Sequence, residues 1–209
     1  MRLCGVILSA GASSRMGRDK ALLPWPPAES GSNTTTNETL LSAAIAALRP
    51  FAETVVVVAG KNADTLAATV AAHGAVMVVN PAPERGQFSS MQIGLSEVFG
   101  RGCDGAMLTL VDSPPLSKAS MEILRTAFDE ALARGGWGVA PENSGRRGHP
   151  LLASRELVEA FLQAPVTSNG REVKRAHADR ITAVAVQDAL VSVDVNTPEE
   201  YAALAQKRQ

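Results

Sequence analysis

The sequence has few of the features that mark several large classes of protein. It contains two cysteines in 209 residues, Cys4 and Cys103, which provide neither a disulfide framework nor the spacing of zinc ligands. It has no basic excess of the kind found in proteins that coat DNA or RNA, because 20 lysines and arginines stand against 21 aspartates and glutamates. No apolar run approaches the roughly 20 residues of a membrane-spanning helix. We therefore expect neither nucleic acid nor a membrane as a partner.

The amino-terminal segment is the one place where a targeting signal needs consideration. The apolar stretch Leu3–Ala12 resembles a short signal peptide, but it contains two glycines and runs into Arg15 and Lys20 without a clear cleavage region. Together with the low cysteine content, this pattern leads us to expect a cytoplasmic protein.

What the chain does have is enough apolar sequence for a sizeable core. Hydrophobic residues make up 45% of it, and the formal net charge is −1. These values exclude an intrinsically disordered chain. The length suits one ordinary domain, and we expect residues 1–209 to form it.

Short aliphatic runs alternate with helical patterns along the first part of the chain. The runs are continuously apolar, as in strands with helices on both faces of their sheet; they are Leu3–Leu8, Thr54–Ala59, Ala75–Val79 and Ala106–Val111. The helical patterns are Thr39–Arg49, Ala63–Ala72, Ser89–Phe99 and Ser117–Arg134. This alternation predicts an α/β fold with a Rossmann-like, doubly wound, mostly parallel sheet in a three-layer α/β/α sandwich.

The rest of the chain is less regular. We expect strands at Trp137–Pro141, Ile181–Val186 and Val191–Val195, and helices at Arg155–Leu162 and Gly170–His177. Thr197 and Pro198 then open a final helix, with Glu199 and Glu200 near its positive end. The segment Pro24–Asn37 lacks periodicity and is rich in Pro, Ser, Thr and Asn, which predicts a loop, either a lid or a surface insertion.

Polar residues and glycines collect directly after the first four predicted strands. These segments are Ser9–Lys20, Gly60–Asn62, Asn80–Gly86 and Asp112–Pro114. The carboxyl ends of parallel strands meet at one edge of an open sheet, where ligands bind. We therefore expect the four segments to line one crevice.

The first of these segments has the composition of an anion-binding turn. Its small residues let backbone N–H groups approach an anion, and Arg15 and Lys20 add cationic donors. It is not a Walker A loop, because five residues separate Gly11 from Gly17 and no Gly-Lys-Ser/Thr follows, and it lacks the G-x-G-x-x-G fingerprint of nicotinamide dehydrogenases. An ordinary glycine-rich surface turn is the alternative, but the position after a buried strand favours an anion site.

Two carboxylates follow apolar runs and suit a hard metal ion. Asp112 ends the fourth predicted strand, a good position for a ligand of Mg²⁺, although a turn-starting aspartate gives the same pattern. Asp194 is the natural second carboxylate, with Asn196 as an alternative oxygen ligand and a helix-entry role as the competing interpretation.

One histidine and one basic cluster are candidates for contact with a ligand. His149 lies in a turn with Arg146 and Arg147, and there a structural role is equally consistent. The basic residues Arg171, Lys174 and Arg175 either hold a phosphate or form a solvated helix face. No Ser/His/Asp or Cys/His arrangement for nucleophilic catalysis stands out at these spacings.

The segment Leu8–Leu23, LSAGASSRMGRDKALL, closely resembles the signature of the MobA-like nucleotidyltransferases, and among them the molybdenum cofactor cytidylyltransferases. The similarity continues in order through Asn80-Pro81, Gly86, Ser89-Ser90, Gly94-Leu95, Asp112–Pro114, Gly145–Pro150 and Asp194–Tyr201. It thus covers essentially the whole chain.

The resemblance implies transfer of CMP from CTP to the phosphate of molybdopterin, with release of pyrophosphate and Mg²⁺ as the cofactor. CTP is favoured over GTP because Leu8–Gly11 is closer to the Leu-Ala-Ala-Gly of cytidylyltransferases than to Leu-Ala-Gly-Gly. The nucleotide half would extend to about residue 115 and the acceptor half over about 116–209. A transient contact with a molybdoenzyme or its chaperone is a further expectation.

The resemblance and the residue pattern together assign roles to individual positions. Arg15, Lys20 and Asp112 are the expected catalytic residues, Asp112 and Asp194 the metal ligands, and His149 and Arg171 the acceptor contacts. The expected nucleotide contacts are Leu8, Ser9, Ala10, Gly11, Ala12, Gly60, Asn80 and Ser90.

Several departures from the family pattern leave the acceptor open. Ser9 replaces an alanine, Gln87-Phe88 a Gly-Met-like pair and Asn196 an aspartate, and Thr167–Arg171 stands where the family tends to show Gly-Asp-x-Gly-Ala-Arg. The alternatives are the same transfer to a sugar or polyol phosphate or from GTP, and a non-catalytic nucleotide-binding module.

Overall fold

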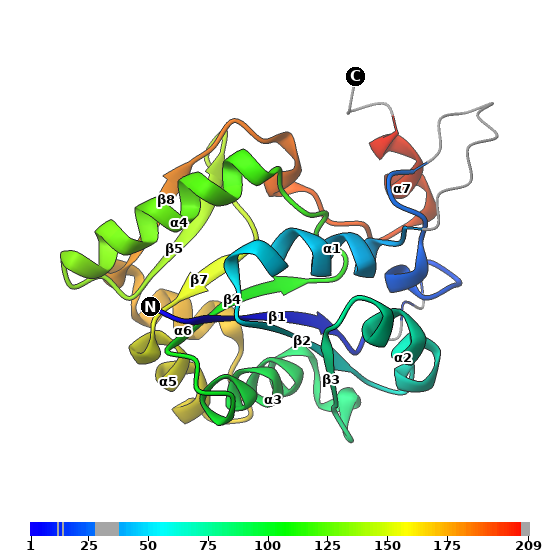
Figure 1. The fold of residues 1–209 in the computed structure, drawn as a ribbon, viewed down its shortest axis with the longest axis horizontal. Helices are drawn as coiled ribbons and strands as arrows, with labels where there is room; N and C mark the ends of the chain where they lie inside the picture. The colour runs from blue at the N-terminus through cyan, green and yellow to red at the C-terminus, as the bar shows by residue number, and fades with distance from the viewer. Residues whose placement is uncertain (12, 14, 28–37, 206–209) are drawn as a thin grey trace.

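The computed structural model describes residues 1–11, 13, 15–27 and 38–205, and within them a central eight-stranded sheet carries helices on both faces (Figure 1). The strands are β1 (Leu3–Ser9), β2 (Thr54–Ala59), β3 (Val76–Val79), β4 (Gly105–Leu110), β5 (Gly138–Asn143), β6 (Arg146–Arg147), β7 (Leu151–Ala153) and β8 (Ile181–Ala185). The α-helices are α1 (Leu40–Leu48), α2 (Ala63–Ala72), α3 (Gln87–Gly100), α4 (Lys118–Ala133), α5 (Arg155–Gln163), α6 (Gly170–Ala176) and α7 (Pro198–Leu204).

The strand order confirms the predicted α/β, mostly parallel architecture. It is β3-β2-β1-β4-β7-β5-β6, with β8 paired to β5. The strands β3, β2, β1 and β4 are parallel, and β8 is parallel to β5, whereas β7 is antiparallel to both of its neighbours. The chain moves outward from β1 to β2 and β3 and then returns to place β4 on the other side of β1. This reversal creates a topological switch point between β1 and β4, the position where open α/β sheets bind ligands.

The apolar character of β1 follows from its central position, since every one of its residues is buried. Ile7 belongs to a core under α1, α2 and α4, whereas Val6 and Leu8 belong to a second core under α3, α5 and α6. Burial on both faces explains why this strand has a continuous rather than an alternating apolar pattern.

Side-chain caps fix three of the helix starts that the sequence predicts. Thr39 forms a capping box with Ser42 at α1, Ser117 accepts a hydrogen bond from the backbone N–H of Ser120 at α4, and Thr197 forms a capping box with Glu200 at α7. These bonds satisfy amide groups that a helix start otherwise leaves unpaired.

The structure corrects the predicted strand at Val191–Val195. This segment overlaps the 3₁₀ helix η5 (Ala189–Ser192), and Val195 N–H donates to the backbone oxygen of Asp112 at 2.8 Å. Asp188 starts η5 by accepting from Leu190 N–H at 3.1 Å, so a side-chain cap prevails over the apolar pattern. The strands β6 and β7 were not predicted, because runs of two or three residues are too short to show periodicity.

The two cysteines, from which no disulfide framework was expected, form a disulfide. Cys4 lies in β1 and Cys103 just before β4, and both side chains are buried. Pairing of β1 with β4 brings together residues 99 positions apart, which their spacing in the sequence does not indicate. In the described part of the chain, no helix has the combined length and hydropathy needed to span a membrane.

Candidate active site

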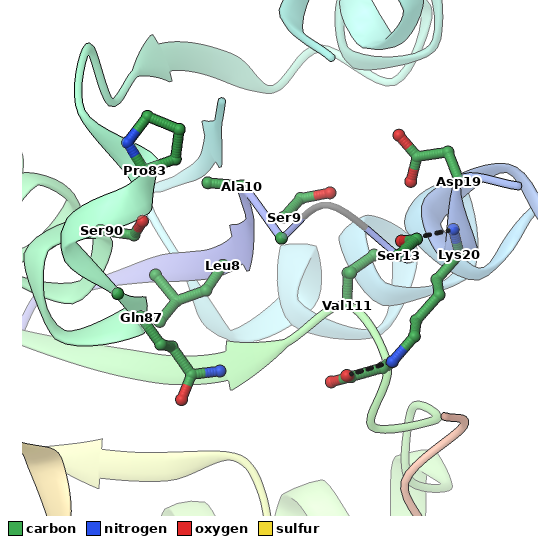
Figure 2. A pocket seen from close by; sticks show the side chains of 13 residues that line it. Leu8, Ser9, Ala10, Ser13, Asp19, Lys20, Pro83, Gln87, Ser90 and Val111 are labelled. Carbon is green, nitrogen blue, oxygen red and sulfur yellow. Dashed lines mark hydrogen bonds and ion pairs between the residues drawn. The ribbon is translucent and has the colours of Figure 1, made fainter. Parts of the chain in front are cut away.

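The carboxyl ends of β1 and β4 and the start of α3 enclose a pocket at the switch point (Figure 2). It is lined by Leu8, Ser9, Ala10, Gly11, Ser13, Asp19, Lys20, Pro83, Gly86, Gln87, Ser90, Val111 and Asp112. A second cavity shares five of these residues and adds Gly17, Arg18, Lys61, Asn62 and Glu84. Residues from all four polar segments that were expected to converge therefore surround one crevice.

Lys20 is the central cation of this pocket. Its Nζ lies 3.0 Å from Asp112 Oδ2 and 3.0 Å from Asn196 Oδ1, and its side chain is only 11% exposed. Arg15 Nη2 approaches the same amide oxygen of Asn196 at 3.4 Å. The structure thus brings the three predicted catalytic residues together, and Asn196 links the two cations.

The backbone around Lys20 is anchored at several points. Lys20 begins the 3₁₀ helix η1 (Lys20–Leu22), which Asp19 caps by accepting from Ala21 N–H at 3.0 Å. Lys20 N–H donates to Ser13 Oγ at 3.2 Å, as the dashed line in Figure 2 shows. Ala21 and Leu23 are completely buried, so the turn is tied to the core directly beside its lysine.

Asn80 shapes the entrance to α3 from the end of β3. It is almost fully buried, and its Nδ2 donates to the hydroxyls of Ser89 and Ser90 at 2.9 Å each. Gly86 precedes the helix with φ +95°, a value that favours glycine. Asn80 itself does not line the pocket, but it fixes Ser90, which does.

Gly60, at the end of β2, lines neither cavity, and its predicted nucleotide contact gains no geometric support. A Cβ at this position would lie 2.9 Å from the backbone oxygen of Ala10. The absence of a side chain is what lets the turn after β2 approach the first loop this closely. Ala12, another predicted contact, lies outside the described residues.

Asp194 contacts Ser113, the residue after Asp112, and does not take part in the Lys20 contact. Its Oδ1 accepts from Ser113 Oγ at 2.7 Å, and it lines a separate cavity together with Arg146 and Asn196. Among the described residues, the second carboxylate oxygens of Asp112 and Asp194 accept no hydrogen bond. Carboxylate and amide oxygens are of the type that Mg²⁺ or Mn²⁺ prefers, and in this structure the amide oxygen of Asn196 accepts from Lys20 and Arg15.

His149 and Arg171, the predicted acceptor contacts, lie outside the pocket lining. His149 Nδ1 is 3.3 Å from the backbone oxygen of Leu108. Burial, followed by the nearby charge of Lys174, lowers the pKa of His149 below its ordinary value of 6.5, while Asp194 and Asp112 oppose this shift. Arg171 is exposed at the start of α6.

Among the lining residues that the sequence analysis did not single out, Ser13, Asp19 and Asn62 form hydrogen bonds that hold the site together. All three lie within polar segments that were expected at the crevice. Their signal is weak, because each acts by a hydrogen bond whose partner the sequence does not reveal.

A small-residue loop, a buried lysine and a carboxylate at the switch point of a parallel sheet are typical of proteins that bind nucleotides through their phosphates. Residues 5–183 match the model of the MobA-like NTP transferase domain, and the chain belongs to this family. It is therefore an enzyme, a nucleotidyltransferase.

The comparisons extend over nearly the full chain. It is 27% identical over 197 residues to the molybdenum cofactor cytidylyltransferase of Escherichia coli K12, covering 94% of this chain and 92% of that protein. The crystal structure of Rv0371c from Mycobacterium tuberculosis H37Rv aligns with a TM-score of 0.77 at 25% identity and covers 99% of both chains. A structure of Rv0371c in complex with manganese has a TM-score of 0.72 at 24% identity, again over 99% of each chain.

Proposed function

We propose that this nucleotidyltransferase transfers CMP from CTP to the phosphate of molybdopterin and releases pyrophosphate. The observation that carries the proposal is the position of Lys20, held between Asp112 and Asn196 in a pocket at the switch point. The similarity to a molybdenum cofactor cytidylyltransferase over 94% of the chain supports the choice of substrates.

In this reaction an oxygen of the acceptor phosphate forms a bond to the α-phosphorus of CTP, and the bond to the β-phosphate breaks. The acceptor oxygen is already anionic at neutral pH, so no strong general base is required. The barrier comes from bringing anions together and from the charge that develops on the leaving pyrophosphate. We assign the neutralisation of this charge to Lys20 and Arg15.

We propose Asp112 and Asp194 as ligands of Mg²⁺, with the amide oxygen of Asn196 as the alternative to Asp194. When bound, the ion would offset the negative charge of the phosphates. The carboxylate of Asp112 already faces Lys20, so both cationic groups would act on the same stretch of the triphosphate.

The nucleotide contacts follow from the pocket. Leu8–Gly11 and Ser90 line it and are proposed to contact CTP directly. Asn80 and Gly60 are proposed to act through the shape they give to the surrounding backbone.

We place the acceptor phosphate near His149 and Arg171, in the acceptor half of the chain. Lys174 lies close to both: burial, followed by the charges of Arg171 and Arg147, lowers the pKa of Lys174 below its ordinary value. Neither Arg171 nor Lys174 forms an ion pair with an acidic side chain of the described residues. An anionic acceptor would supply the missing counter-charge.

The proposal is tested by measuring pyrophosphate release from CTP, GTP, UTP and ATP with Mg²⁺. Each nucleotide is paired with molybdopterin and with a panel of sugar and polyol phosphates. We expect the fastest release with CTP and molybdopterin. A preference for GTP or for a sugar phosphate would replace the proposed substrates, and no release with any pair would contradict catalysis altogether.

A further inference from the structure

Asn62, in the turn after β2, forms hydrogen bonds with two positions in the loop after β1, Ser9 and Asp19, and with Gly60 of its own turn. Its Nδ2 donates to the backbone oxygen of Ser9 at 2.9 Å and to Asp19 Oδ2 at 2.6 Å. Its Oδ1 accepts from Gly60 N–H at 3.0 Å. Both amide hydrogens and the amide oxygen are therefore engaged, which no other side-chain type reproduces in this geometry.

These contacts lead directly to Lys20. The other carboxylate oxygen of Asp19 accepts from Ala21 N–H and so caps the short helix that Lys20 begins. Lys20 Nζ then lies 3.0 Å from Asp112. A displacement of Asp19 would be transmitted through this cap to the lysine.

Asn62 also fixes the orientation of the Asp19 carboxylate. Asp19 lines both cavities, and a carboxylate that turned toward the phosphates of a bound nucleotide would repel them. The cap and Asn62 between them use both oxygens of Asp19 and hold the carboxylate against the protein backbone.

We propose that Asn62 is a positioning residue for nucleotidyl transfer. It holds Asp19, and through it Lys20, in a fixed position relative to the ends of β1 and β2. This inference rests on the role proposed above for Lys20. It concerns the side chain of a residue in the turn after β2, not a group that contacts the reacting phosphorus.

The first test is N62A in the pyrophosphate assay with CTP, Mg²⁺ and molybdopterin. Loss of positioning should lower kcat/KM about 10- to 100-fold, mainly through kcat. Asn143→Ala is the matched control, because Asn143 Nδ2 likewise donates to a backbone oxygen, that of Val186, at 2.9 Å, but lies outside the pocket. Equal effects of the two substitutions would overturn the proposal.

A double-mutant cycle with K20A separates positioning from general stability. If Asn62 acts through Lys20, N62A should cost little further activity in the K20A background. Independent effects that multiply would overturn the positioning role and leave that of Lys20 intact. Near-native activity of K20A would instead overturn the proposed function on which this inference rests.

N62D provides a second test, which applies if N62A does not fold. It keeps the size of the side chain but places a second carboxylate where the amide now donates to Asp19, so that the hydrogen bond is replaced by like-charge repulsion. Arg18, Lys61 and Glu84 line the same cavity and are unchanged in all variants. The kcat/KM of N62D should therefore fall at least as far as that of N62A, whereas Asn143→Asp should retain near-native activity, and equal losses in these two aspartate variants would contradict the proposal.

Discussion

Ser9 contributes a buried hydroxyl for which the described residues offer no hydrogen-bond partner. Ser9 is the last residue of β1 and lines the pocket, at a position where the family pattern has an alanine. A buried polar group without a partner costs about 1–3 kcal/mol of folding free energy. The hydroxyl of Ser9 therefore lowers the stability of the folded state.

Ser9→Ala should raise the free energy of unfolding by about 1 kcal/mol, because it removes the unsatisfied hydroxyl and almost no volume. Urea denaturation measures this change. Ser120→Ala is the control, since Ser120 is equally buried but donates to Asp188 Oδ2 at 3.0 Å, and it should lower stability. Destabilisation of both variants alike would contradict the interpretation.

His149 predicts a dependence of stability on pH. Burial keeps its folded pKa below the ordinary 6.5, so the unfolded state binds more protons as the pH falls through that value. The free energy of unfolding should then decrease between about pH 7 and pH 5. The native protein should lose more stability over this range than His149→Gln, as followed by urea denaturation at each pH. Parallel curves would show that the pKa of His149 is not lowered.

Single residues differ in how far the sequence reveals them. Lys20 and Asp112 were predicted from the small-residue turn and the apolar strand that precede them and from the resemblance to the family. Asn62 was not, since its role depends on Ser9 and Asp19, which are 53 and 43 residues away. Hydrogen-bond partners at that separation follow only from the folded arrangement.

At the level of secondary structure, the turns after β1 and β2 have to approach each other closely. Gly60 allows this, and a methyl group there would meet the backbone oxygen of Ala10, which cannot rotate away. The geometry of the first loop thus depends on a residue of the second strand's turn.

Gly60→Ala should destabilise the protein by about 1–3 kcal/mol and weaken CTP binding, because relief of the clash must move one of the two turns. Calorimetric titration with CTP and thermal unfolding measure both effects. Gly100→Ala is the matched control: a Cβ there meets nothing within 4 Å, and alanine favours the helix end. If Gly60→Ala bound CTP as the native protein does, the loop geometry would not require the glycine.

Helices and strands were predicted well where their apolar or periodic pattern extends over six residues or more. The bounds of β2 and α2 agree with the sequence pattern, since both runs are clearly apolar or clearly periodic. The strand expected at Val191–Val195 was wrong because Asp188 organises a turn there, and β7 was missed because it has only three residues. A local cap decides the first of these short segments and pairing with β4 and β5 the second, so that propensity decides neither.

The whole molecule adds a covalent link that local patterns do not show. Cys4–Cys103 closes a loop with a sequence separation of 99, and the entropy model gives about 4.7 kcal/mol for a loop of about 100 residues. Reduction of this disulfide should therefore lower the urea concentration at which half of the protein is unfolded. Two free thiols in the denatured, unreduced protein would show that the link is absent.

The arrangement of the whole sheet creates the site, because the switch point brings loops from β1, β2, β3 and β4 around two cavities that share five of their lining residues. The sequence predicted this convergence from the strand ends alone. It did not predict the insertion of antiparallel β7 between β4 and β5, which changes the sheet beyond the site.

Lys20→Ala is the most direct test of the central claim that a triphosphate binds between Lys20, Arg15 and Asp112. Pyrophosphate release from CTP should fall by orders of magnitude while thermal unfolding shows a folded protein. Lys118→Ala, which removes an exposed lysine whose ion pair among the described residues is with Glu122, should retain native turnover. Near-native release by Lys20→Ala would contradict the account.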